Sequence, residues 1–185
     1  RYQAVSGTEL RLKQFYPTHM NRNRRVFEAG IEFAKKGGVI DFTTSTTDFD
    51  LQHGEVAAAA ALAEALYLGI APLQLTLSSD GNASLPLYND DGELQGLQVG
   101  QVRSLFQSMR DAVQRHHVPL AQALTSVTAA PAAVLGLQQK GRLAPGLDAD
   151  LVLLRRDDLQ IDSVIAKGRM LVQGGAALVK GTFER

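Results

Sequence analysis

Apolar and polar residues follow two alternating patterns over the first three quarters of the chain. Residues 38–44 and 73–77 are short, β-rich apolar runs of the kind that form buried strands. Residues 24–36 instead repeat apolar positions at helical spacing, and residues 55–68 are rich in Ala and Leu, which favour a helix. The connections are long enough for crossovers, so the pattern predicts parallel strands.

A third apolar run precedes His19. We interpret Phe15-Tyr16 as part of a strand that begins near Gln14, and both Asn21 and Asn23 are candidate N-caps of the helix that follows. The sequence therefore predicts the order strand, helix, strand, helix, strand.

The second half of the chain begins with a long loop that has turn residues at 89–92. Apolar positions then recur with the helical period over residues 98–116, and Thr128 is a candidate cap for a short helix over residues 129–137. Beyond Gly141 the pattern changes to short strands, the last two of which are joined by a Gly174-Gly175 hairpin signal. These strands are expected at residues 150–155, 163–167, 169–172 and 177–179.

Composition limits the possible functions. The chain has 185 residues, of which 45% are hydrophobic, so it can bury the core of one domain or of one domain with a small appendage. Basic and acidic residues number 19 each, and the resulting zero net charge gives no general attraction to nucleic acid or to an anionic membrane. Because the chain has no Cys, any metal ion would have to be held by His and carboxylate groups.

No apolar run approaches the roughly 20 residues that a membrane span requires. The longest candidate, Val56 to Leu68, is interrupted by Glu64. The sequence begins with Arg1 rather than Met and shows no charged segment followed by an apolar one, as a secretory signal would. We therefore expect no membrane partner, and we expect this chain to begin within a longer protein.

Two metal-capable side chains, His19 and Asp80, each follow an apolar run. In a parallel α/β barrel the reacting groups lie at the carboxyl ends of the strands, so these two side chains are expected in one active site. Imidazole and carboxylate groups both bind divalent cations. The pattern therefore predicts metal-assisted hydrolysis.

Other charged residues have simpler explanations. Arg24 and Arg25 are interpreted as a solvated helix start, because no aromatic residues interleave with them as in nucleic-acid-binding segments. The pair His116-His117 is expected to cap helix carbonyls or to face water. Asp148 and Asp150 lack the remaining ligands of a calcium site, so they are expected to bond to loop backbone.

Several motifs resemble the amidohydrolase superfamily. Residues 140–152 are similar to the segment in which such chains leave a (β/α)8 barrel and add strands to a small β-sandwich. Within that superfamily, Pro-Thr-His-Met-Asn-Arg-Asn at 17–23, Ser-Ser-Asp-Gly-Asn at 78–82 and Lys-Gly-Thr-Phe-Glu at 180–184 resemble segments of the isoaspartyl dipeptidase family. The resemblance covers nearly the whole chain but only the C-terminal half of that family.

The resemblance implies an α/β fold in two parts. Residues 1–139 would be the C-terminal portion of a TIM-type (β/α)8 barrel, with strands six, seven and eight beginning near Gln14, Gly38 and Leu73. Residues 140–185 would supply strands of the small β-sandwich domain.

The resemblance also implies residue roles around two Zn²⁺ ions. His19 resembles the ligand of the more exposed zinc, and Asp80 resembles the ligand of the more buried zinc that also takes a proton from the attacking hydroxide. Arg22 and Ser84 match positions that hold substrate, and a guanidinium suits a carboxylate. The remaining ligands of the family, including a His-x-His pair and a carboxylated lysine, have no counterpart in this chain, so this part alone is expected to be inactive.

By the same resemblance, the intact protein would be a cytoplasmic homo-oligomer, an octamer, that hydrolyses the isopeptide bond of β-aspartyl dipeptides. Another amidohydrolase activity, as a cyclic-amide hydrolase, deacetylase or deaminase, is an alternative, although the Asn21-Arg22-Asn23 segment and residues 180–184 argue against it. An inactive, truncated remnant is a further alternative.

Overall fold

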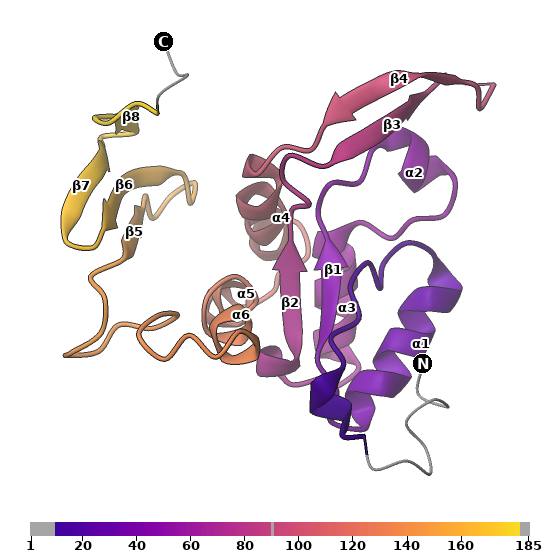
Figure 1. Ribbon diagram of the computed structural model, residues 1–185, viewed down its shortest axis with the longest axis horizontal. Coiled ribbons are helices and arrows are strands. Elements are labelled where there is room, and N and C mark those ends of the chain that lie inside the picture. The colour runs from indigo at the N-terminus through magenta and orange to yellow at the C-terminus, as the bar shows by residue number, and fades with distance from the viewer. Residues whose placement is uncertain (1–9, 90, 182–185) are drawn as a thin grey trace. The chain divides into compact units, whose positions relative to one another are not determined.

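The structure is a computed structural model that describes residues 10–89 and 91–181, and it separates into two compact units (Figure 1). The larger unit is Arg1–Leu135 and the smaller is Gly136–Arg185. The expected boundary, between residues 139 and 140, was set from the resemblance and lies within the smaller unit. Residues 182–184 of the last family motif lie outside the described residues.

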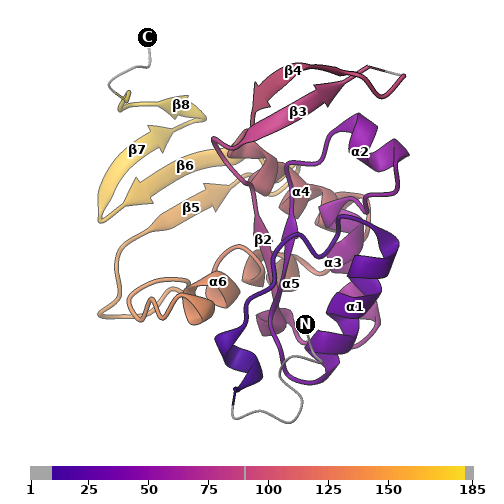
Figure 2. The same cartoon turned by 45° about the vertical axis from the view of Figure 1, so that its right-hand side comes forward.

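The centre of the larger unit is a parallel pair of strands, as the crossover pattern predicted. Strands β1 (Ile40–Thr43) and β2 (Leu75–Ser78) pair in parallel, with Ile40 opposite Leu75. Their side chains are almost entirely buried, so the polar residues that alternate with the apolar ones, such as Asp41 and Thr76, are enclosed as well. Helices α1 (Arg24–Lys35) and α3 (Ala58–Tyr67) pack on this sheet (Figure 2).

Aromatic and aliphatic side chains from both layers fill the core. The rings of Phe27 on α1 and Phe42 on β1 stack with centroids 5.8 Å apart, and both residues are fully buried. Asn23 caps α1 by accepting a hydrogen bond from the Val26 amide at 3.0 Å, which confirms one of the two predicted caps.

The strand predicted before His19 does not form among the described residues. A short 3-10 helix, η1 (Leu12–Gln14), stands there instead, and the chain then runs beside β1 with two backbone bonds. The Asp41 amide donates to the Pro17 carbonyl and the Met20 amide donates to the Asp41 carbonyl, each at 3.0 Å. Pairing stops at these two bonds because Pro17 has no N–H and His19 has a positive φ of 58°.

The loop predicted after Asp80 is instead an antiparallel hairpin of β3 (Ser84–Tyr88) and β4 (Leu94–Val99). Asn89 and Gly92 of the predicted turn lie at its tip, where the Gly92 amide donates to the Asn89 carbonyl. The expected helix over residues 98–116 consequently begins later, as α4 (Arg103–Gln114), because its first residues are needed for β4.

Three further α-helices lie in the described part of the larger unit. Helix α2 (Asp48–Gln52) follows β1, and α5 (Leu120–Thr125) and α6 (Ala129–Val134) follow α4. The 3-10 helix η2 (Pro72–Gln74) leads into β2. Thr128 precedes α6 as predicted but does not cap it, because its hydroxyl donates to the Leu124 carbonyl.

The smaller unit is a four-stranded antiparallel sheet in the order β5-β6-β7-β8. Its strands lie close to the predicted positions: β5 (Leu151–Leu154), β6 (Ile161–Ala166), β7 (Arg169–Gln173) and β8 (Ala176–Ala177). Gly174 and Gly175, which join the last two, both have positive φ, as a tight hairpin turn requires.

Lys140 organises the loop that precedes β5. Its ammonium group pairs with the carboxylates of Asp148 and Asp150, and Asp150 also accepts from the Lys167 amide at 2.7 Å. These contacts give the two aspartates a structural role in the loop, in line with the sequence interpretation.

The described part of the chain contains mixed α and β structure, and none of its helices combines the length and apolar character needed to cross a membrane.

Candidate active site

The side chains of His19 and Asp80 meet beyond the carboxyl ends of β1 and β2. His19 Nδ1 lies 3.6 Å from Asp80 Oδ2, although the two residues are far apart in sequence. Their side chains are 38% and 30% exposed, so both are open to solvent and to a small ligand. The structure therefore brings together the two groups that the sequence singled out as metal-capable.

Both residues occupy the left-handed region of backbone conformation. The φ angle is 58° at His19 and 46° at Asp80, values that residues other than Gly adopt at a cost of about 1–3 kcal/mol. Local bonds hold the two turns: the Arg22 amide donates to the His19 carbonyl at 3.1 Å, and the Ala83 amide donates to the Asp80 carbonyl at 2.9 Å. Strain of this kind concentrates where a side chain must point in a particular direction.

Strand β1 supplies a further support for His19. The hydroxyl of Thr43, the last residue of β1, is hydrogen-bonded to His19 Nδ1. The Thr43 amide in turn donates to Asn21 Oδ1 at 2.8 Å. The orientation of the imidazole is therefore tied to the buried sheet.

Arg22 lies on the turn that carries His19 and forms an ion pair with Glu55, at 3.0 Å between Nη1 and Oε2. Its side chain is partly exposed, whereas that of Glu55 is buried. Glu55 carried no signal in the sequence, because a lone Glu before an Ala-rich helix is ordinarily a solvated residue.

Ser84 begins β3, four residues after Asp80, and is exposed. Within residues 10–89 and 91–181, no hydrogen bond or ion pair joins its side chain to His19, Arg22 or Asp80. The structure thus brings His19 and Asp80 into one cluster and places Arg22 on the turn beside them, but it leaves Ser84 at the base of the hairpin.

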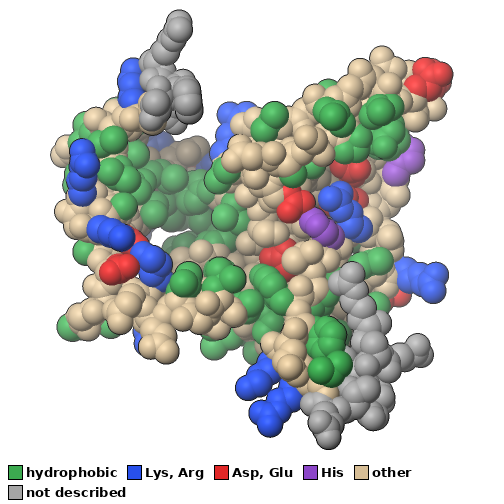
Figure 3. Space-filling model, in the orientation of Figure 1, with side chains coloured by type: hydrophobic (Ala, Val, Ile, Leu, Met, Phe, Trp, Pro, Cys, Tyr) green, Lys and Arg blue, Asp and Glu red, His purple; other side chains and the backbone are tan. Residues whose placement is uncertain are grey.

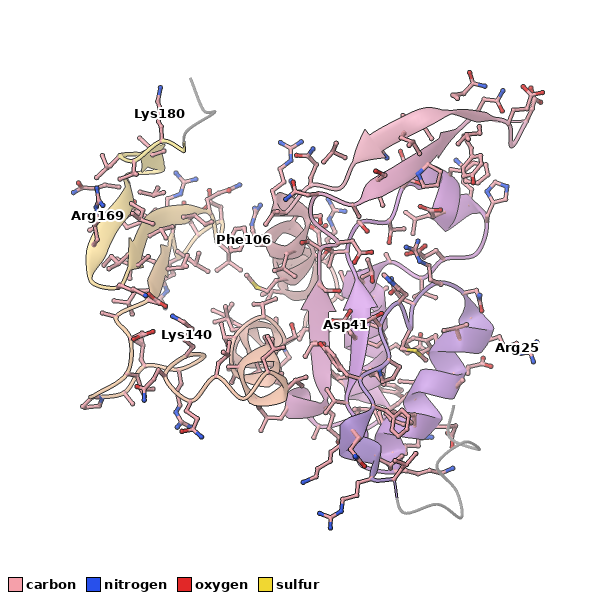
Figure 4. All side chains as sticks on the ribbon, in the orientation of Figure 1. Arg25, Asp41, Phe106, Lys140, Arg169 and Lys180 are labelled. Carbon is pink, nitrogen blue, oxygen red and sulfur yellow. The ribbon has the colours of Figure 1, made fainter. Side chains whose placement is uncertain are left out.

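Asp41 is a buried acid in the middle of β1 (Figure 4). It accepts hydrogen bonds from the hydroxyls of Thr76, at 2.7 Å, and of Ser78 and Tyr16. Burial raises the pKa of the Asp41 carboxyl, and the three hydroxyl bonds oppose that rise. Burial likewise raises the pKa of Tyr16 to about 12, against the opposing bond to Thr76. Asp41 carried no signal in the sequence, since one Asp within Val-Ile-Asp-Phe indicates only an interruption of an apolar strand.

Acidic, basic and histidine side chains gather on one face of the larger unit (Figure 3). The exposed helix-start arginines are not part of the cluster: Arg24 pairs with Glu28 and Glu64, and Arg25 points away from the sheet (Figure 4).

A groove of about 800 Å³ runs between this turn and α1, and both His19 and Arg22 line it. Asp80 is not among its lining residues, so the groove lies beside the His19–Asp80 pair rather than over it.

His19 and Asp80 lie close enough to serve one dinuclear metal centre, and the bond of His19 Nδ1 to Thr43 leaves Nε2 as the nitrogen that could bind a cation. No cluster of three or more potential ligands occurs within the described part of the chain, so these residues supply an incomplete ligand set. An imidazole and a carboxylate are the donor types expected for zinc in a chain without Cys.

Residues 17–171 match the Amidohydrolase family, so the chain belongs to that family. The chain is similar to a β-aspartyl dipeptidase from the thermophilic, keratin-degrading Fervidobacterium islandicum AW-1, solved in complex with the dipeptide β-Asp-Leu. The two are 36% identical, with a TM-score of 0.83, over 98% of this chain and 45% of that chain. A second structure of a β-aspartyl dipeptidase from the same organism gives 33% identity and a TM-score of 0.78 over 98% of this chain and 44% of that chain.

An N-acetylglucosamine-6-phosphate deacetylase from Thermotoga maritima is 16% identical with a TM-score of 0.60, over 86% of this chain and 47% of that chain, a likeness of fold alone. The chain thus spans less than half the length of each of these three relatives. The predicted resemblance to the isoaspartyl dipeptidases is confirmed.

Proposed function

We propose that the protein to which this chain belongs hydrolyses the isopeptide bond of β-aspartyl dipeptides with two bound zinc ions. The observation that carries the proposal is the 3.6 Å approach of His19 Nδ1 to Asp80 Oδ2, in a chain 36% identical to a β-aspartyl dipeptidase. This chain supplies two of the ligands, and the rest of the ligand set, including a carboxylated lysine, would come from a part of the protein outside it. The chain alone would accordingly be inactive.

When bound, the metal ions would acidify the attacking water and polarise the scissile carbonyl. Asp80, partly exposed beside His19, would accept a proton from that water on a carboxylate oxygen and pass it to the leaving amine. The Thr43 bond and the left-handed turn would keep the His19 imidazole in place during this transfer.

Arg22 and Ser84 would bind the substrate. The Arg22 guanidinium offers several N–H donors to a substrate carboxylate, and a partly exposed position suits contact with a small ligand. Ser84, exposed at the start of β3, would offer a hydroxyl to the substrate backbone. From the same resemblance, we propose that the protein is cytoplasmic and assembles as a homo-octamer. Sedimentation analysis of the protein would test the number of subunits.

The experiment compares β-Asp-Leu with α-Asp-Leu as substrates of the longest natural polypeptide that contains this chain, loaded with zinc. We expect hydrolysis of the β-linked dipeptide and none of the α-linked one. His19→Asn and Asp80→Asn, which suit a left-handed backbone, should lower kcat/KM by roughly 100-fold to 10,000-fold. They should also lower the zinc content.

His53→Asn is the matched control. His53 is exposed at the end of α2 and stacks on Phe49, so its replacement should leave zinc content and kcat/KM unchanged. If the zinc-loaded protein turned over neither dipeptide, the peptidase assignment would be wrong.

A further inference from the structure

Glu55 is a buried carboxylate that no sequence motif singled out. It lies between α2 and α3, and its side chain is only 3% exposed. A carboxylate is costly to bury unless charged or hydrogen-bonding partners replace the water it loses. The partners of Glu55 therefore indicate what it does.

Both oxygens of Glu55 have partners on the turn that carries Arg22 or in the loop after β1. Oε2 accepts from Arg22 Nη1 at 3.0 Å. Oε1 accepts from the Thr46 hydroxyl at 2.7 Å and from Asn21 Nδ2 at 3.4 Å. Because Thr46 and Asn21 hold Oε1, that end of the carboxylate is fixed independently of Arg22.

The backbone beside the ion pair is also fixed. The Val56 amide donates to the Asn21 carbonyl, and Asn21 Nδ2 donates to the Val56 carbonyl, each at 2.8 Å. Asn21 precedes Arg22 and Val56 follows Glu55, so these two bonds clamp the segments that carry the pair. Asn21 is fully buried, which shields the clamp from water.

The pair is asymmetric. The Arg22 side chain is 38% exposed, whereas its partner is 3% exposed, so the anchor lies inside the protein and the guanidinium reaches toward solvent. The bond to Glu55 uses Nη1, and a guanidinium carries five N–H donors in a rigid plane. Fixing one nitrogen of a planar group restricts the direction in which the others point.

We propose that Glu55 is a positioning residue that orients the Arg22 guanidinium for a carboxylate of the substrate. This inference rests on the proposed function and adds to it a residue that acts through Arg22 rather than on the substrate. Partly buried ion pairs contribute little net stability, so orientation accounts better than stability for a carboxylate held by three donors. Without Glu55, Arg22 would sample more rotamers, and substrate binding would have to order it.

The test is a double-mutant cycle in the longest natural polypeptide that contains this chain, assayed with β-Asp-Leu. Glu55→Gln keeps the shape and removes the charge, Arg22→Met removes the guanidinium, and the third variant carries both changes. We expect Glu55→Gln to raise KM by roughly 10-fold, as for loss of a bond to a charged group, with kcat changed much less. In the Arg22→Met background, Glu55→Gln should add no further rise in KM.

Two further variants separate positioning from folding. Glu55→Asp retains the charge and should restore part of the lost affinity, giving a KM between those of the wild type and Glu55→Gln. Glu64→Gln is the matched control: it removes a carboxylate that pairs with Arg24 through an exposed contact, so KM should not change. Thermal melting of each variant reports folding separately from KM.

The outcomes distinguish the two proposals. Two results would overturn the positioning role and leave the peptidase assignment intact. The first is hydrolysis of β-Asp-Leu by Glu55→Gln with the KM of the wild type. The second is a rise in KM on Glu55→Gln that is equally large in the wild-type and the Arg22→Met backgrounds. Failure of the wild type to hydrolyse β-Asp-Leu would remove both. If Glu55→Gln did not fold, a KM for Glu55→Asp equal to that of the wild type would likewise overturn the role.

Discussion

Gly100 packs against the turn that carries Asp80, and a methyl group added at position 100 should displace that turn. Gly100 is buried directly after β4, and a Cβ placed there would lie 2.5 Å from the Asp80 carbonyl oxygen and 3.5 Å from that of Ala83. Two backbone bonds hold the segments together: the Gly100 amide donates to the Ala83 carbonyl at 2.8 Å, and the Asn82 amide donates to the Gly100 carbonyl at 2.9 Å. Gly100→Ala must therefore displace the turn that carries Asp80.

The size of the effect follows from that overlap. To reach an ordinary contact, the new methyl group and the Asp80 carbonyl must separate by roughly 1 Å, and both are attached to backbone that cannot swing aside. Overpacking of this kind costs about 1–3 kcal/mol of unfolding free energy. A displacement of about 1 Å at a reacting group lowers the rate by roughly 100-fold, so we expect a similar fall in kcat/KM.

Urea denaturation and β-Asp-Leu hydrolysis by the zinc-loaded protein measure the two effects. Gly96→Ala on β4 is the control, because a Cβ there meets nothing within 4 Å. Ala in place of an unstrained Gly should leave stability unchanged or raise it by about 0.4–1 kcal/mol. Equal stability and equal activity of the two Ala variants would refute the argument that Gly100 maintains the Asp80 turn.

Three further changes test the fold itself. Phe42→Ala leaves a cavity at the centre of the buried sheet and should lower the unfolding free energy by about 3–5 kcal/mol in urea titrations. A loss below about 1 kcal/mol would mean that neighbouring side chains move in and fill the cavity. Asn23→Ala removes the cap of α1 and should cost about 1 kcal/mol, whereas Thr128→Ala, at a position without a capping bond, should cost less in the same titration. Asp41→Asn should change the pH dependence of stability. Burial raises the pKa of Asp41 above its ordinary value of 3.8, so its contribution to stability is full below about pH 4 and is lost as pH rises through the folded-state pKa. Stability of the wild type relative to Asp41→Asn should therefore fall over that range, and parallel pH profiles would contradict the assignment.

Local sequence signals predicted the elements whose residues interact mainly with their neighbours. Asn23 was identified as a candidate cap because a capping bond joins residues three apart, and β1 and β2 overlap the β-rich stretches 38–44 and 73–77. The Gly174-Gly175 hairpin was predictable for the same reason, since its turn needs positive φ at adjacent positions.

The hairpin β3–β4 was missed because its apolar residues are not buried. Leu94, Leu97 and Val99 are all exposed, and the predicted helix over residues 98–116 was extended over Gln98 and Val99, the last two residues of β4. The segment before His19 was mistaken for a strand because Phe15 and Tyr16 form a short apolar run, whereas the segment makes only two backbone bonds to β1, at Pro17 and Met20.

The residues of the candidate site likewise fall into those that a local sequence signal predicts and those that it does not. His19, Arg22 and Asp80 stand in recognisable motifs at the ends of apolar runs, so the sequence identified them, and the structure then brought His19 and Asp80 together. Glu55 contacts Arg22 33 residues away, and Asp41 contacts Thr76 and Ser78 35 and 37 residues away, and no local pattern reports such distant contacts. Groups that support a site from a distance become visible only when the fold is known.

The left-handed turns at positions 19 and 80 have a consequence for laboratory evolution. Gly tolerates such a backbone without penalty, so Asp80→Gly relieves local strain while it deletes the carboxylate that we propose acts in hydrolysis. Selection for heat resistance alone would enrich this replacement and yield sturdier, inert proteins. Libraries built on this scaffold should therefore be sorted for turnover before they are sorted for melting temperature.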